Sequence, residues 1–161
     1  MPGGFCIRSR QRRVIVDSLL ILFQRDLGRL RDEIYAFPND DSLWKVKDGI
    51  TNTAGHLVLH LVGNLRHFIG HVIGESGYER DRAHEFGTTF MQREDLLDRI
   101  DACEREVVAA LSEFNEDLLN TNYPIEVFGE PMTYAFFLQH LNGHFNYHLG
   151  QINYYRRLGK K

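Results

Sequence analysis

Hydrophobic residues recur at three- and four-residue steps in four stretches of the chain, which span residues 16–34, 54–72, 96–118 and 137–155. This spacing places the hydrophobic side chains on one face of a helix, the pattern of an amphipathic α-helix that packs against a core. The cluster Thr51-Asn-Thr53 suits an N-cap of the second helix, Thr133 precedes the fourth, and Thr89 with Gln92 has the spacing of a capping box before the third. The pattern predicts an all-α protein, a four-helix bundle.

The connections between these helices differ in length. Residues 74–88 join the second helix to the third, and this is long for adjacent antiparallel helices, so we expect the segment to cross the end of the bundle or to fold over it. Before the fourth helix, Pro124–Met132 could form a small β-hairpin with Gly129 in its turn. Because no repeat or composition shift divides the chain, we expect a single domain over residues 1–161.

Composition narrows the classes of partner. The net charge is −3 and charged residues make up 25% of the chain, and the basic residues Arg8, Arg10, Arg12 and Arg13 form a short cluster and no extended face. We therefore expect no nucleic-acid partner. Because no segment approaches the roughly 20 apolar residues of a membrane span, we expect no membrane association either. Cys6 and Cys103 have no motif around them, which fits a reducing cytoplasm.

Two histidines of the fourth helix carry the strongest chemical signal. His144 and His148 lie four residues apart, so their rings share one helical face, in the stripe expected to face the core. Burying two imidazoles costs free energy unless each is paired, and neutral imidazole is a common ligand for transition metals. We interpret the pair as metal ligands. The intervening Phe145 and Asn146 leave out the glutamate of the HExxH signature, which excludes a zincin-type protease.

The second helix offers several candidates for a third ligand. His60 borders its apolar stripe, with His56 one turn before it and Asn64 one turn after it, and His67 and His71 continue the same edge. Spacing alone does not choose among these residues. His140, one turn before His144, is expected to frame the site, and interface positions are expected for His67, His71 and His84.

Three segments together resemble the DinB-like family, the damage-inducible four-helix-bundle metalloproteins. These segments are residues 59–68 of the second helix, residues 80–86 of the long connection and residues 144–152 of the fourth helix. Carried over residue by residue, the resemblance implies the metal ligands His60, His144 and His148. Characterised members include thiol-S-transferases and a mycothiol-dependent isomerase, which use thiols such as bacillithiol, mycothiol or glutathione. The resemblance thus implies a metal cofactor, joined in the transferases by a low-molecular-weight thiol.

Three functions follow from three histidines that leave a coordination position open. The first is a thiol-S-transferase that adds the thiol to a small electrophile, with Asn64 and Gln151 as candidate ligand-binding residues. The second is a metal-dependent hydrolase, which the lack of an Asp or Glu beside the ligands in the sequence disfavours. The third is a non-enzymatic metal-binding or ligand-binding bundle. A His₃ site accepts Zn²⁺, Ni²⁺, Fe²⁺ or Mn²⁺. Aromatic residues near Tyr154 and Tyr155, expected to be exposed, suggest a homodimer.

Overall fold

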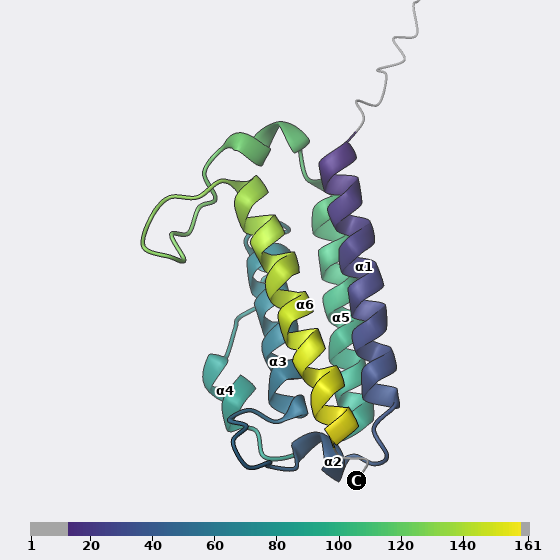
Figure 1. Ribbon diagram of the computed structural model, residues 1–161. Coiled ribbons are helices and arrows are strands. Elements are labelled where there is room, and N and C mark those ends of the chain that lie inside the picture. The colour runs from purple at the N-terminus through teal and green to yellow at the C-terminus, as the bar shows by residue number, and fades with distance from the viewer. Residues whose placement is uncertain (1–12, 159–161) are drawn as a thin grey trace, which may run out of the picture.

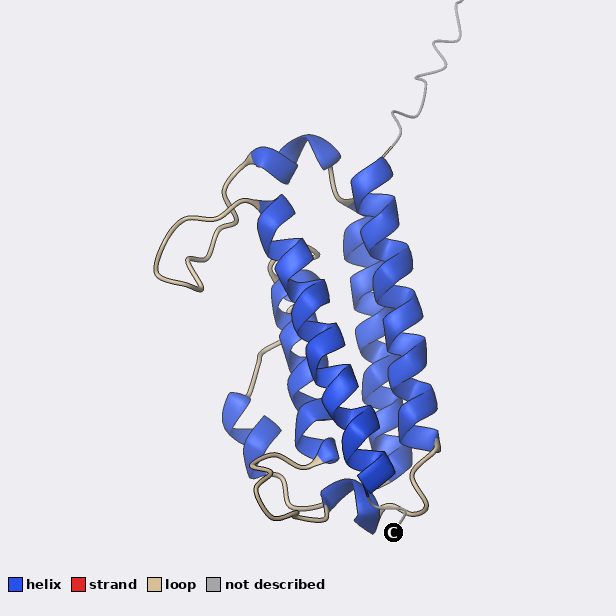
Figure 2. Cartoon of the chain, in the orientation of Figure 1, coloured by secondary structure: helices blue, strands red, loops and turns tan. Residues whose placement is uncertain are grey.

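Four long helical segments run beside one another in the computed structural model, which describes residues 13–158 (Figures 1 and 2). They are α1 (Val14–Tyr35), α3 (Ala54–Leu65) with its π-helical continuation η1 (Arg66–His71), α5 (Arg93–Glu113) and α6 (Tyr134–Leu158). Three short helices lie between them, α2 (Asp41–Trp44), α4 (Arg82–Gly87) and η2 (Glu116–Asn120). The prediction of an all-α four-helix bundle is confirmed. Cys6, Arg8, Arg10 and Arg12 lie outside the described residues.

The core follows from the hydrophobic periodicity of the four long segments. On α1 the buried positions include Val16, Phe23, Leu30 and Ile34, as the spacing predicts. α1 packs on α5 and α6, and α3 packs on α5 and α6 from the other side, so the order around the bundle is α1, α5, α3, α6. Cys103 of α5 is fully buried among these apolar side chains, and burial raises the pKa of its thiol. This cysteine is therefore a core residue.

The direction of the helices explains the long connection before α5. In Figure 1, α3 and α5 both run upward, whereas α1 and α6 both run downward. Because α3 and α5 are parallel, the chain has to return along the bundle before α5 can begin. It does so over the outside of α3, against which α4 packs. Of the two predicted paths, the connection follows the one that folds over the bundle. This path places α4 against α3.

Local capping predictions were right for α3 and wrong for α5. Thr53 is the N-cap of α3, and it accepts a hydrogen bond from the backbone N–H of His56 in a capping box. At α5 the N-cap is Gln92, which makes no side-chain capping bond. The backbone N–H of Arg93 instead donates to Asp40 from the segment before α2. A tertiary contact thus replaces the predicted Thr89–Gln92 box.

Two further predictions about the top of the bundle were wrong. α5 ends at Glu113, and Leu118 is an exposed residue of η2 rather than part of the third helix. Residues 124–132 form no strand; a single bridge between Asn122 and Thr133 closes the loop. The backbone N–H groups of Val127 and Gly129 instead donate to the carbonyls of Ile125 and Glu126 in local turns.

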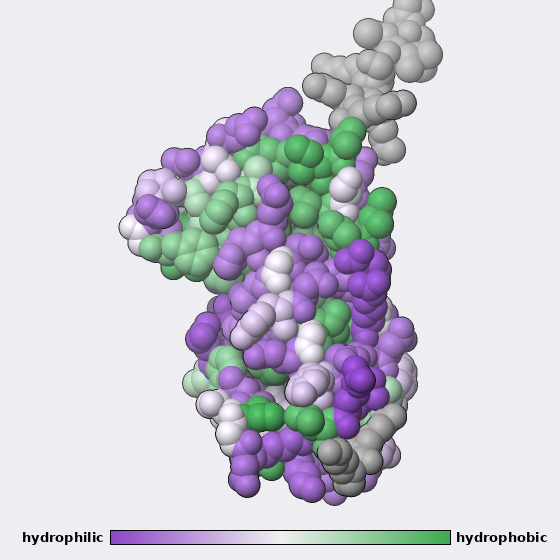
Figure 3. Space-filling model, in the orientation of Figure 1, coloured by the Kyte–Doolittle hydropathy of each residue, from purple (hydrophilic) through white to green (hydrophobic). Residues whose placement is uncertain are grey.

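The surface is uneven in polarity. Figure 3 shows hydrophobic side chains gathered toward the end that carries the loop before α6, and a mainly hydrophilic surface elsewhere on this face. Exposed apolar residues of that loop and the start of α6 include Val127, Phe128 and Phe136. Tyr154 is exposed as expected, but Tyr155 is buried against Phe37, so that half of the expectation was wrong. Within residues 13–158, no helix has the length and apolar content needed to cross a membrane.

Candidate metal centre

Three imidazole rings meet where α3 and α6 face each other. His60 is buried on α3, and His144 and His148 are half-buried on α6. The ring centroid of His60 lies 5.1 Å from that of His144 and 5.2 Å from that of His148. The ring centroids of His144 and His148 are 4.5 Å apart. The α6 pair lies at the edge of the apolar stripe beside Phe145 and Leu149, so it faces α3 rather than the middle of the core.

The same nitrogen of each ring points into the space between the rings. Nε2 of His144 is 3.3 Å from Nε2 of His60 and 3.1 Å from Nε2 of His148. One ligand atom from each of the three residues lies within 4.8 Å of the others. Two metal–nitrogen bonds of about 2.0–2.1 Å at a tetrahedral angle put the nitrogens about 3.3–3.4 Å apart. The three side chains therefore fit around one metal ion.

Hydrogen bonds on the far side of two rings direct their lone pairs inward. Nδ1 of His60 donates to Oε2 of Glu85 at 3.0 Å, and Nδ1 of His148 donates to Oε1 of Gln151 at 2.6 Å. A neutral imidazole that donates through Nδ1 carries its lone pair on Nε2. Both rings are thus held in the tautomer that binds a metal, as the outer partners of metal-binding histidines do.

The third ring, that of His144, is strongly held in its neutral form. Burial lowers the pKa of His144 to about 4, and the nearby rings of His148 and His60 add to this effect. Burial also lowers the pKa of His148, although its bond to Gln151 opposes the shift. Metal binding requires neutral imidazoles. At neutral pH the rings of His144 and His148 therefore release no proton when they bind a cation.

Glu85 is the functional residue that sequence reasoning missed. Its carboxylate is buried and accepts from Arg80 as well, through Nε at 2.6 Å and Nη2 at 2.9 Å. Burial by itself would raise the pKa of Glu85, but the hydrogen bonds from His60 and Arg80 lower it overall. A charged carboxylate is therefore fixed behind His60. The sequence feature that could have indicated a helix around Glu85 is Asp81. Its side chain caps α4, and Glu85 lies one turn inside this short helix.

Gly63 makes room for this carboxylate. It lies on α3 close to His60, and a Cβ atom built there would be 2.2 Å from Oε1 of Glu85. That separation is far below van der Waals contact, so any larger residue would push the Glu85 carboxylate away from α3. The position of the Glu85 carboxylate, and with it the His60–Glu85 bond, depends on a glycine at this position.

The two residues predicted to bind a ligand lie in different surroundings. Gln151 is exposed, and it joins His148 to the hydroxyl of Tyr147, to which its Nε2 donates at 3.3 Å. Asn64 is buried one turn beyond His60, and its Oδ1 has no hydrogen-bond partner among the described residues. Gln151 thus contacts a ring of the cluster, whereas Asn64 makes no hydrogen bond to it within residues 13–158.

The other histidines lie outside the cluster. His56 completes the cap of α3 and bonds to the carbonyl of Thr88 at 2.8 Å, and His84 on α4 lies beside the Thr88 hydroxyl. The rings of His67 and His71 stack at 6.0 Å along the edge of η1. His140 is exposed, with its ring 6.1 Å from that of His144. His140 lies at the border of the cluster as expected, and His67 is half-buried. His71 and His84 are exposed, so the interface positions expected for these two residues were wrong.

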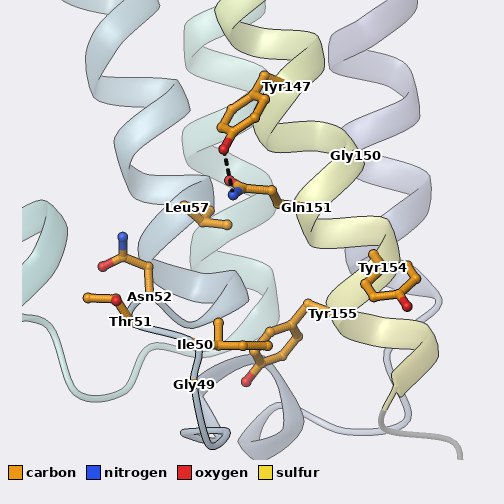
Figure 4. A pocket seen from close by; sticks show the side chains of 10 residues that line it. All are labelled: Gly49, Ile50, Thr51, Asn52, Leu57, Tyr147, Gly150, Gln151, Tyr154 and Tyr155. Carbon is orange, nitrogen blue, oxygen red and sulfur yellow. Dashed lines mark hydrogen bonds between the residues drawn. The ribbon is translucent and has the colours of Figure 1, made fainter.

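A cleft opens beside the cluster at the Gln151 side. It has a volume of about 630 Å³ and lies between α6 and the loop that leads into α3 (Figure 4). Gln151 and Tyr147 form part of its wall, and Leu57 of α3 lies opposite. Since Gln151 bonds to His148, the cleft is one side chain away from the histidine cluster. This volume lies within the range of about 300–1,000 Å³ that is common for small-molecule sites.

Comparison with known proteins finds a matching family model and similar solved structures. The model of the family described as "Protein of unknown function (DUF1572)" matches residues 20–161. Among solved structures, a DinB-like protein from Bacillus cereus ATCC 10987 superposes with a TM-score of 0.68 at 21% sequence identity, over 89% of this chain and 91% of that chain. This likeness shows that the two share a fold. No curated protein matches the chain.

Proposed function

The chain belongs to DUF1572, a DinB-like family of proteins of unknown function, and we propose that it is a metal-dependent thiol-S-transferase. In this proposal His60, His144 and His148 are the metal ligands. The observation that carries it is the convergence of three imidazole Nε2 atoms, two of them on rings whose Nδ1 atoms are hydrogen-bonded on the outer side. A divalent transition metal, Zn²⁺, Ni²⁺, Fe²⁺ or Mn²⁺, is the cofactor.

The ligand set favours a catalytic site over a structural one. Structural zinc sites usually close their shell with four protein ligands, whereas catalytic sites keep a position for water or substrate. Within residues 13–158 the cluster contains three histidines and no cysteine or carboxylate ligand. When bound, the metal would lower the pKa of a thiol at that position, which is about 8.5 for a free thiol, and so supply a thiolate at neutral pH.

The protein's own residues hold this arrangement in place. Glu85, charged and clamped by Arg80, fixes the ring of His60, and Gln151 fixes the ring of His148. The ring of His60 cannot turn its Nδ1 inward without losing a buried hydrogen bond, which costs about 1–3 kcal/mol. The bond between His148 and Gln151 is exposed, so it holds its ring less strongly. The side chains therefore present their lone pairs before any ligand arrives.

Two observations favour thiol transfer over hydrolysis. Activation of water usually needs a carboxylate or similar base close to the metal. Glu85, the carboxylate next to the cluster, is buried and occupied by Arg80 and His60. The cleft beside Gln151 has no Asp or Glu in its lining. A thiol needs less help from the protein, because its proton passes to solvent once its pKa is lowered.

A conjugation assay with monochlorobimane and a panel of thiols tests the proposal. The thiolate sulfur attacks the carbon that bears chlorine, the S–C bond forms as the C–Cl bond breaks, and chloride leaves with the bonding electrons. We expect conjugation with at least one low-molecular-weight thiol, lost on metal chelation and in His148→Ala, and retained in His140→Ala. Absence of metal-dependent conjugation with every thiol would refute it. Ester or amide hydrolysis without thiol would indicate the hydrolase. No activity in either assay would indicate a metal-binding bundle without enzymatic function.

The remaining expectations about the whole protein are part of this proposal. We propose one DinB-like domain over residues 1–161, a cytoplasmic location, a small-molecule substrate and a homodimer. The single described cysteine, Cys103, is buried and free, which fits a reducing compartment. Exposed Tyr154 and the exposed apolar residues Phe128 and Phe136 support self-association, which sedimentation of the purified protein would test.

A further inference from the structure

The cleft between α6 and the loop before α3 has an unusual lining for a cavity next to a proposed metal site. Tyr147, Tyr154 and Tyr155 contribute aromatic rings, and Ile50 and Leu57 contribute aliphatic side chains. No Asp, Glu, Lys or Arg is among the lining residues. A charged ligand entering this cleft would lose water without meeting an opposite charge, which costs free energy. An uncharged ligand would not.

The aromatic wall is regular because it lies on one helical face. Tyr147, Gln151 and Tyr154 are spaced four and three residues apart on α6, so they stand one above another. Tyr147 and Tyr154 are 64% and 63% exposed, which leaves much of each side chain free for contact. Figure 4 shows both rings on the α6 side of the cleft, with Gln151 between them pointing toward Leu57. A planar molecule could pack against these rings.

The opposite wall supplies polar groups that carry no charge. A tight turn with Gly49 at φ +74° and a bridge between Lys47 and Ile50 set the path of the loop. Thr51 and Asn52 follow this turn and line the cleft. Among the described residues, neither side chain makes a hydrogen bond, so both are available to the carbonyl or hydroxyl of a ligand.

Gln151 connects this cleft to the histidine cluster. Its Nε2 donates to the Tyr147 hydroxyl in the cleft wall, and its Oε1 accepts from Nδ1 of His148. A molecule that touches Gln151 is therefore separated by one side chain from a proposed metal ligand. The cleft therefore lies on the outer side of His148, opposite to the nitrogen that faces the other two rings.

We propose that this tyrosine-lined cleft is a ligand-binding site beside the histidine cluster and that it selects an uncharged, planar aromatic or quinoid compound. This assignment does not depend on the proposed thiol-S-transferase function. The binding preference itself rests on the lining of the cleft. A binding experiment without thiol and without turnover therefore tests the cleft separately from the reaction.

Binding of two naphthalenes of equal ring size to the purified full-length protein, measured by saturation-transfer NMR titration, tests this inference. Neutral 2-naphthol is expected to bind at least about tenfold more tightly than anionic 2-naphthalenesulfonate, and Tyr154→Ala is expected to weaken 2-naphthol binding about tenfold. Tyr35→Ala, at a comparably exposed tyrosine of α1, is the matched control and should bind as wild type does. Equal binding of the two naphthalenes, or equal effects of the two substitutions, would overturn the proposal. Loss of thiol conjugation with normal 2-naphthol binding would instead count against the reaction alone.

Discussion

His60 uses its two ring nitrogens for different purposes. Nδ1 donates to the buried carboxylate of Glu85, and Nε2 faces the two histidines of α6. The negative charge behind the ring makes His60 a better electron donor and fixes its orientation, and both effects strengthen metal binding. We therefore assign Glu85 a positioning role that acts through His60.

Replacement of Glu85 by Gln tests this role. We expect Glu85→Gln to lower metal affinity about 10- to 100-fold, because an amide is a weaker acceptor than a carboxylate and frees the ring of His60. Competition against a chelating dye measures the affinity. Glu106→Gln is the matched control, since Glu106 forms a similar bidentate pair with Arg66 on another part of the bundle. Unchanged affinity in Glu85→Gln would contradict the assigned role.

Asp26 is a second buried carboxylate, and its role is structural. It is fully buried on α1 and accepts from Asn142 and Asn146 of α6 and from Arg25. Asp26→Ala would remove the acceptor of the Asn142 amide and one of the two acceptors of the Asn146 amide, so we expect it to lower the free energy of unfolding by about 2 kcal/mol. Urea denaturation measures this change. Asp17→Ala, at an exposed residue of the same helix, should change stability by less than about 0.5 kcal/mol.

The same residue predicts how stability depends on pH. Burial alone would raise the pKa of Asp26, but its bonds with Arg25, Asn146 and Asn142 lower it below the ordinary value of 3.8. Below pH 3.8 the unfolded chain takes up this proton first, so the free energy of unfolding falls as the pH falls toward the native pKa. In Asp26→Ala the slope of stability against pH below 3.8 should be shallower. An identical slope would contradict the assignment.

At the scale of single residues, the sequence predicted the three histidines of the cluster but not the buried carboxylates. An i, i+4 spacing ensures that His144 and His148 share a face, and the family resemblance selected His60, which lies beside them. Glu85 could not be found in this way, because it is 25 residues from His60 on a short helix without a hydrophobic period. The same limit applies to Asp26, whose asparagine partners on α6 lie more than 100 residues away.

The packing of α4 on α3 links the site to the level of helices. Gly63 leaves room on α3 for the carboxylate of Glu85, which reaches His60 from α4. We expect Gly63→Ala to displace Glu85 and to lower both the melting temperature and the metal affinity, although alanine is the better helix former by about 1 kcal/mol. Gly143→Ala on α6 is the control, because an added Cβ there has no atom within 4 Å. That variant should be as stable as wild type or more so, and equal metal affinity in both would refute the packing argument.

The presence of the long helices could be predicted from the sequence, whereas the residues at which they begin and end could not be predicted as well. The hydrophobic period of α1 or α6 is sustained over many turns, and burial of that face decides the outcome. An end depends on a few hydrogen bonds, which a distant residue can supply. Asp40 caps α5 from another segment, so the local Thr89–Gln92 pattern is not used. Likewise, the segment predicted to form a hairpin at 124–132 forms local turns, and only one bridge is present beside it.

For the whole molecule, the parallel course of α3 and α5 is what the helix pattern could not predict. Helix periodicity gives the buried face of each segment but not its direction in the bundle. The length of the 74–88 connection was the one available signal, and it left two paths open, one across the end of the bundle and one folded over it. The path over the bundle carries Arg80 and Glu85 to the outer side of α3, where they reach the cluster.

Metal binding should stabilise the folded molecule as a whole. The three Nε2 atoms lie on α3 and α6, so they come together only in the folded chain. A metal present at 100 times its dissociation constant would add about 2.7 kcal/mol to the free energy of unfolding. We expect chelation to lower the melting temperature of wild type in a scanning calorimeter, and metal addition to restore it. An unchanged melting temperature would contradict this coupling.

Metal content with the spectrum of the Co²⁺-substituted protein tests the central claim most directly. We expect close to one transition metal per chain in wild type, a Co²⁺ spectrum that changes when thiol is added, and loss of the metal in His60→Ala and in the His144→Ala, His148→Ala double variant. His140→Ala, which changes an exposed histidine at the border of the cluster, should keep its metal. Full metal occupancy in the double variant would show that these three histidines do not form the site.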